Sequence, residues 1–183
     1  MRLFAAVLPP EAAVAELAEA VDPLRDDRLK WTGRAGWHFT LAFLGEVRDE
    51  VLPELHARLA RAAHRTAPFG LRLHGAGHFG AHALWAGAAG DLDAMRLLAE
   101  RADAAARRAG VPMDRHRRYT PHLTLGRSRD GAALDPYLEA LSGFEGTAWR
   151  VDTLSLVRSN LPVSGVPGER PRYETTASWP LGG

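Results

Sequence analysis

One short pattern occurs twice in this chain and constrains its fold more than any other feature. The pattern is His-x-Thr-Leu, which begins at His38 and again at His122, 84 residues later in a chain of 183. The composition predicts on the order of 0.05 chance copies. A repeat at nearly half the chain length is typical of a duplicated unit. We therefore expect two related lobes.

Each copy lies in a segment whose composition favours a β-strand, residues 37–44 and residues 122–127. Side chains two residues apart point to the same face of a strand. The histidine and the threonine of each copy should therefore project together, while the two apolar residues project the other way. If the lobes face each other, the two polar faces can meet across a cleft.

Helical and strand patterns alternate along the rest of the chain. Helices are predicted at residues 10–25, from Asp49 to about residue 64, from Asp91 to near Gly110, and at residues 135–141. Strands are predicted at residues 2–8, 83–88, 151–157 and 173–179, with a further strand near 69–73. Residues 74–82, rich in glycine and histidine, are predicted to form a loop.

These patterns predict an α+β fold: a bilobal duplicated unit with two mainly antiparallel sheets around a central cleft and helices on the outer faces. No change in composition marks a linker. Residues 1–183 should therefore form a single domain of two pseudo-symmetric, intertwined lobes.

Composition excludes several classes of protein. The chain has no cysteine, which rules out disulfides, thiolate metal sites and a cysteine nucleophile, and fits a reducing compartment. The formal net charge is +1, far from the basic balance of a protein that coats nucleic acid. No apolar segment is long enough to span a membrane, and the N-terminus lacks signal-peptide features. We expect a monomeric cytoplasmic protein with no membrane partner.

Two imidazoles and two hydroxyls that face each other suit phosphodiester chemistry. Imidazole titrates near neutral pH, so one ring can accept a proton while the other donates one. The hydroxyls can donate hydrogen bonds to phosphate oxygens as charge shifts. Carboxylates do not cluster near either motif, so we expect neither a metal nor another cofactor. A lone histidine in an apolar strand is structural roughly four times in five, but the shared hydroxyl two residues on reverses those odds.

The two motifs resemble the signatures of the 2H phosphoesterase superfamily, and in particular its RNA 2′,3′-cyclic phosphodiesterase family, also described as the bacterial and archaeal 2′–5′ RNA ligase family. The likeness includes HFTLAFLGEV at residues 38–47 and TPHLTLGR at residues 120–127. It extends to MRLFAA at residues 1–6, ALWAG at residues 83–87 and the segment 172–181. Phe39 departs from the leucine of many relatives, and residues 74–82 match no part of the family pattern.

The resemblance implies a metal-independent reaction that opens a terminal RNA 2′,3′-cyclic phosphate to a 2′-phosphate, with 2′–5′ ligation as its reverse. It implies that His38 is the proton donor to the leaving 3′ oxygen and that His122 is the proton acceptor that activates water. Thr40 and Thr124 would bind the phosphate, and Arg127 would add a charged contact.

Other candidate binding residues are less specific. Arg118, with Arg115 and Arg117, precedes the second motif and could hold an RNA backbone or simply face solvent. Trp31 is a candidate for stacking on a terminal base, although core packing is the commoner fate of a tryptophan. Phe4 is a candidate for lining the groove, with core packing as its alternative. The histidines of residues 74–82 recur every four positions, but the glycines among them argue against a helical metal site, which we rate at roughly one in ten.

Three hypotheses therefore stand for the partner and the activity. The first is an enzyme that acts on RNA with a 2′,3′-cyclic phosphate terminus. The second keeps the site but takes a small cyclic nucleotide or a 2′–5′ linked oligonucleotide. The third is a non-catalytic module that binds RNA ends. Phosphate contacts beyond the site would favour long RNA over a small nucleotide.

Overall fold

The computed structural model describes residues 1–114, 118–161 and 171–183 and has the α+β architecture that the sequence predicts. Its α-helices are α1 (Glu11–Val21), α2 (Leu52–His64), α3 (Leu92–Arg108) and α4 (Asp135–Leu141). Its strands are β1 (Arg2–Val7), β2 (Leu29–Trp31), β3 (Phe39–Glu46), β4 (Phe69–Phe79), β5 (Ala83–Gly90), β6 (Leu123–Ser128), β7 (Trp149–Val151), β8 (Thr153–Asn160) and β9 (Arg172–Pro180).

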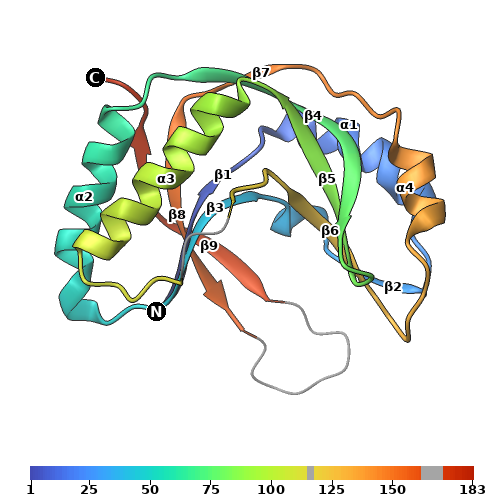
Figure 1. Ribbon diagram of the computed structural model, residues 1–183, viewed down its shortest axis with the longest axis horizontal. Helices are drawn as coiled ribbons and strands as arrows, with labels where there is room; N and C mark the ends of the chain where they lie inside the picture. The colour runs from blue at the N-terminus through green and yellow to red at the C-terminus, as the bar shows by residue number, and fades with distance from the viewer. Residues whose placement is uncertain (115–117, 162–170) are drawn as a thin grey trace.

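The strands form two antiparallel sheets, as predicted. One sheet has the order β3-β1-β8-β9 and the other has the order β2-β6-β5-β4-β7. Helices α2 and α3 pack on the first sheet through β9 and β3, while α1 and α4 pack against β4 of the second. Figure 1 shows the two pairs of helices at opposite sides of the molecule, with the sheets between them.

The chain passes repeatedly from one sheet to the other. Helix α1 follows β1 of the first sheet but packs on the second, and α3 follows β5 of the second sheet but packs on the first. One continuous cluster of buried apolar side chains includes members of both sheets and of all four of these helices. On this ground we propose that the lobes form one intertwined domain.

Local sequence accounts for the start of α3 and the end of α1. The Asp91 carboxylate accepts a hydrogen bond from the Ala94 amide at 3.0 Å, which caps α3 as the sequence predicts. The helix predicted over residues 10–25 is shorter in the structure than expected. Helix α1 ends at Val21, and a 3-10 turn follows over Asp22–Leu24. Pro23 lies in that turn, where its missing N–H cannot continue an α-helix. Among the described residues, no helix combines the length and the apolar character of a membrane span.

Both motif strands show the predicted alternation. Phe39 and Leu41 are buried on β3 while Thr40 between them is only partly buried, and β6 repeats this pattern around Thr124. Each histidine immediately precedes its strand. The apolar residues enter the core and the polar ones stay on the opposite face.

The prediction of a loop over residues 74–82 is wrong. Strand β4 continues to Phe79 and pairs with β5, and only residues 80–82 form the turn of this hairpin. The glycines that indicated a loop have other roles: Gly75, at φ 62°, lies in a bulge between Leu73 and Ala76, and Gly80, at φ 55°, forms the turn. Gly77 lies under the ring of Trp85, where a side chain would collide.

Substitution of Gly77 by alanine should destabilise the hairpin. A Cβ atom there would meet the Trp85 indole at 2.2 Å, so the ring must move. We expect the free energy of unfolding to fall by about 1–3 kcal/mol, measured by urea denaturation, and tryptophan fluorescence to change. Gly70→Ala on the same strand is the matched control, because its Cβ would meet nothing within 4 Å. Equal stability of the two variants would contradict the packing role of Gly77.

Candidate active site

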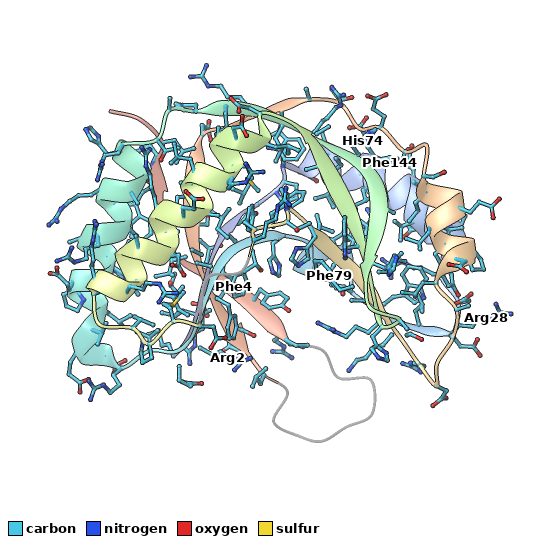
Figure 2. All side chains as sticks on the ribbon, in the orientation of Figure 1. Arg2, Phe4, Arg28, His74, Phe79 and Phe144 are labelled. Atoms are coloured by element: carbon cyan, nitrogen blue, oxygen red, sulfur yellow. The ribbon has the colours of Figure 1, made fainter. Side chains whose placement is uncertain are left out.

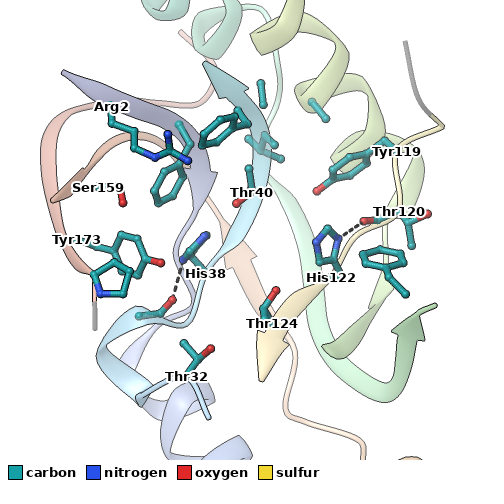
Figure 3. Close-up of a pocket in the computed structure, with 18 of the residues that line it drawn as sticks. Arg2, Thr32, His38, Thr40, Tyr119, Thr120, His122, Thr124, Ser159 and Tyr173 are labelled. Atoms are coloured by element: carbon teal, nitrogen blue, oxygen red, sulfur yellow. Dashed lines mark hydrogen bonds between the residues drawn. The ribbon is translucent and has the colours of Figure 1, made fainter. Parts of the chain in front are cut away.

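A groove of about 1270 Å³ lies between the two sheets and collects both motifs. Strands β3 and β6, which belong to different sheets, contact each other at its base. Figure 3 shows His38 and Thr40 on one wall and His122 and Thr124 on the other. The structure therefore brings together the four residues that the sequence singles out.

The two histidines are anchored in the same way. Nδ1 of His38 lies 2.7 Å from the carbonyl oxygen of Gly36, and Nδ1 of His122 lies 2.8 Å from that of Thr120. A carbonyl can only accept, so each Nδ1 carries the hydrogen and donates it. In the neutral ring, Nε2 is therefore an unprotonated acceptor, and it is the atom available for proton exchange on each ring.

Each imidazole also rests against two aromatic rings. Phe4 stacks on His38 with ring centres 4.5 Å apart, and Tyr173 meets the His38 ring edge-on at 5.2 Å. On the other wall, Phe79 meets His122 edge-on at 4.7 Å and Trp85 lies 6.1 Å away. These contacts, together with the carbonyl anchors, restrict rotation of both rings.

The electrostatic environment of His38 favours its neutral form. Burial lowers the pKa of His38 below the ordinary value of 6.5, and the nearby His122 lowers it further by charge repulsion. The hydrogen bond to the Gly36 carbonyl opposes this shift without reversing it. A bound anion would favour the protonated ring, since an opposite charge nearby raises the pKa of an imidazole.

Both motif threonines line the groove and are partly buried. Within the described ranges, neither hydroxyl is engaged in a hydrogen bond to another side chain or to the backbone. With Nε2 of each histidine, they give the groove two hydroxyl donors and two groups able to exchange a proton, a set that can support acid–base chemistry at a phosphate.

Arginines surround this centre on the solvent side. Arg127 on β6 is exposed, pairs in register with Lys30 on β2, and lines the groove. Arg118 is also exposed and lines the groove. Arg115 and Arg117 lie outside the described residues. Arg2 on β1, which the sequence did not single out, lines the groove as well.

Trp31 and Phe4 both line the groove but are almost fully buried. Trp31 is 6% exposed, and its Nε1 donates a hydrogen bond of 2.9 Å to the Asp26 carbonyl. Phe4 is 4% exposed and lies beneath His38. Their burial gives both rings a packing role, and for Phe4 that role is support of the catalytic candidate His38.

Three groove aromatics were not identified from the sequence. Tyr173 and Phe79 flank the histidines from β9 and β4, and Tyr119 lies three residues before His122. The Tyr119 hydroxyl is buried without a hydrogen-bond partner among the described residues, and burial raises its pKa. Figure 3 shows this hydroxyl directed toward the wall that carries Thr40. Only Tyr119 carried a sequence signal, its place beside the motif.

The histidines of residues 74–82 do not gather. His74 lies in the bulge of β4 and His78 lies beyond it, where its Nδ1 donates to the Gly80 carbonyl at 2.7 Å. His82 lies in the hairpin turn. In the part of the chain that the structure describes, no group of three His, Cys, Asp or Glu side chains is placed to hold a metal ion.

Comparisons with known proteins point to one family. Residues 9–161 match the family model described as the 2′-5′ RNA ligase superfamily. A Thermus thermophilus protein named RNA 2′,3′-cyclic phosphodiesterase is 35% identical over 186 residues, which cover 90% of this chain and 85% of that protein. A Geobacillus stearothermophilus protein of the same name is 33% identical over 158 residues, 82% of this chain; the match spans about half, 47%, of that relative's length.

Solved structures share the fold. The apo structure of Escherichia coli LigT aligns with a TM-score of 0.79 over 100% of this chain and 98% of that chain, at 24% identity. Its complex with 3′-AMP gives the same TM-score at 25% identity, covering 98% of this chain and 97% of that one. These neighbours confirm the predicted arrangement of two antiparallel sheets and surrounding helices.

The titration of His38 tests the electrostatics of the groove. By NMR titration, we expect His38 to titrate below pH 6.5, because burial disfavours its charged form. His122→Gln should raise the pKa of His38, since it removes the repelling charge, but burial should still hold it below 6.5. Titration at or above 6.5 in the wild type would contradict the burial argument.

The lowered pKa of His38 also determines how the free energy of unfolding depends on pH. As the pH falls through 6.5, the unfolded chain takes up a proton at this site before the folded protein does. The contribution of neutral His38 to the free energy of unfolding is therefore intact above pH 6.5 and is lost progressively as the pH falls toward its folded pKa.

Proposed function

The chain belongs to the 2′-5′ RNA ligase superfamily, and on that premise we propose that it hydrolyses RNA 2′,3′-cyclic phosphate ends to 2′-phosphates without a metal ion. The name shared by its relatives from Thermus and Geobacillus supports the activity. The observation that carries the proposal is the pair of identically anchored histidines, each beside a threonine, on opposite walls of one groove.

The proposed reaction places the cyclic phosphate between the two walls. Nε2 of neutral His122 takes a proton from a water molecule as the water oxygen bonds to phosphorus. The bond from phosphorus to O3′ breaks, and Nε2–H of protonated His38 delivers its proton to O3′. The products are a 2′-phosphate and a 3′-hydroxyl, and the two histidines have exchanged protonation states.

Anchoring at Nδ1 makes this exchange possible. Each ring keeps its Nδ1 hydrogen on a backbone carbonyl throughout, so only Nε2 gains or loses a proton. The threonine hydroxyls donate to the non-bridging oxygens, where negative charge shifts during the displacement. Arg127 and Arg118 add positive charge at the rim of the groove. Ligation through a 2′–5′ bond would use the same atoms in the opposite direction.

His38 must be protonated to act as the proton donor, and a bound substrate favours that form of the ring. Burial disfavours protonated His38 in the empty groove, but a bound phosphodiester carries a negative charge next to it. That charge raises the pKa of the ring and offsets the desolvation. The enzyme would therefore load its acid most effectively when substrate is present.

Removal of either histidine should abolish most of the activity. With a short RNA ending in a 2′,3′-cyclic phosphate, in EDTA, we expect wild type to form the 2′-phosphate and His38→Ala and His122→Ala to lose about 10²–10⁴-fold in kcat. His82→Ala, an exposed histidine in the β4–β5 turn, is the matched control and should keep full activity.

Two results of this assay would refute the proposal. Binding of the RNA by wild type without conversion would indicate a module that recognises ends. Loss of activity in EDTA that added metal restores would indicate a metal-dependent reaction.

The pH dependence should be bell-shaped and should separate the two roles. His38 must be charged to donate its proton, and its pKa in the free protein is lowered. With rising pH, kcat/KM should therefore begin to fall before pH 6.5 is reached. The optimum of kcat should lie at higher pH, since bound phosphate raises that pKa. In His122→Gln, the residual rate should lose the acidic limb and keep the basic one. A flat wild-type profile between about pH 5 and 8 would contradict the two-histidine mechanism.

A further inference from the structure

A row of three polar side chains crosses the first sheet on the wall of the groove that carries His38. Leu3 pairs with Arg158, which places their neighbours Arg2 and Ser159 alongside each other, and Ser159 pairs directly with Tyr173. Residues opposite each other in an antiparallel sheet point to the same face. All three residues of this row line the groove, and Figure 3 shows them on one wall.

The shape of the row suits a small anion. Neighbouring strands lie about 4.8 Å apart, so the backbone positions of Arg2 and Tyr173 are separated by about 10 Å with Ser159 between them. The Ser159 side chain is short and those of Arg2 and Tyr173 are long; the Arg2 guanidinium, which lies over Phe43 on the β3 side, would turn toward Ser159 to meet an anion there. The row then offers a guanidinium and two hydroxyls as hydrogen-bond donors.

The Arg2 end of the row lies one step beyond the catalytic centre. Phe4 stacks on His38, and Arg2 lies two residues before Phe4, on the same face of β1. Two residues of a strand extend about 7 Å. Arg2 is therefore displaced along this wall by roughly the length of one nucleotide, while Tyr173 at the other end of the row contacts the His38 ring.

The row carries one positive charge, that of the Arg2 guanidinium. The Arg2 guanidinium lies 4.8 Å from the centre of the exposed Phe43 ring, and among the described residues it forms no ion pair. Glu46, its register neighbour on β3, instead pairs with the N-terminal amine at 3.5 Å. Arg127 on the opposite wall acts, like Arg2, on the Tyr173 hydroxyl and opposes the rise in pKa that burial causes there.

We propose that Arg2, Ser159 and Tyr173 form a second phosphate subsite, which binds the internucleotide phosphodiester that joins the terminal nucleotide to the one before it. This inference rests on the proposed function and names its substrate class. An oligonucleotide end supplies both phosphates, the cyclic one at the histidines and the diester at the row. A cyclic mononucleotide supplies only the first and leaves three donors in the groove without a partner.

The test compares four substrates: a nucleoside 2′,3′-cyclic phosphate, the same compound with a 5′-monophosphate, a dinucleotide ending in the cyclic phosphate, and that dinucleotide with a neutral methylphosphonate linkage. We expect wild-type kcat/KM to be about tenfold higher for the dinucleotide than for the cyclic mononucleotide. Arg2→Met should remove most of that advantage and leave the cyclic mononucleotide within about twofold. The methylphosphonate dinucleotide should be insensitive to Arg2→Met, since it lacks the charge that Arg2 contacts.

Two further variants keep the test decisive. Tyr173→Phe retains the ring that packs on His38 and removes only the hydroxyl, so its loss should also be confined to the dinucleotide. Arg158→Met is the matched control: it pairs with Leu3, which is buried in the core on the other face of the sheet, and should leave all four rates unchanged.

Three results would overturn the subsite. Equal losses on the mononucleotide and the dinucleotide in Arg2→Met would mean that Arg2 only supports His38. An unchanged dinucleotide rate in both variants would mean that the row does not bind phosphate. Absence of an Arg2-dependent gain on the 5′-monophosphate, whose phosphate occupies the position of the internucleotide diester, would mean that the dinucleotide gains from its second nucleoside and not from a phosphate at the row. If wild type hydrolyses none of the substrates, the proposed function itself fails, which is a separate result.

Discussion

Side-chain alternation along β3 and β6 is the constraint on which the groove depends. Phe39 and Leu41 on one strand and Leu123 and Leu125 on the other are buried in the same continuous core. A shift of one residue in either strand would move its apolar pair into the groove and its threonine into the core. Exposure of each apolar side chain would cost about 1.5–3 kcal/mol. The core therefore holds the register, and the polar face of each strand is positioned as a consequence.

The histidines precede these strands by one residue, so the sheets alone do not fix their rings. Backbone carbonyls two residues earlier hold Nδ1 in both copies, and a pair of aromatic rings restricts each imidazole. The aromatic rings come from β1 and β9 on one side and from β4 and β5 on the other. Four strands outside the motifs thus contribute to the geometry of the two histidines. This explains why the chain crosses so often between its sheets: each half supplies a motif, and both halves complete its surroundings.

The sequence predicted the features that depend on residues close to one another in the chain. The repeated motif, its alternation and the cap at Asp91 all follow from residues within a few positions of one another, and the structure has them. The loop prediction over residues 74–82 failed because glycine indicates a loop only when no tertiary contact explains it. Here Gly77 makes room for the Trp85 ring, a contact between two strands that composition cannot predict. Tyr173 and Phe79 were missed for the same reason, since their value lies in their contacts with histidines 135 and 43 residues away in the chain.

The distribution of charge connects the site to the kind of ligand that it suits. The chain as a whole carries a net charge of only +1, so long-range attraction to nucleic acid is weak and affinity must come from local contacts. The basic side chains that line the groove, among them Arg2 and Arg127, come from both of its walls, whereas Glu100, Asp103 and Asp114 belong to α3 and the segment that follows it. Phosphates are attracted to the arginines and repelled from the carboxylates. A nucleic-acid strand whose cyclic phosphate lies between the histidines would therefore avoid the carboxylates of α3. The row of Arg2, Ser159 and Tyr173 runs across the first sheet from β1 toward β9, away from β3 on which α3 packs, and so offers the next phosphate a position without facing carboxylates.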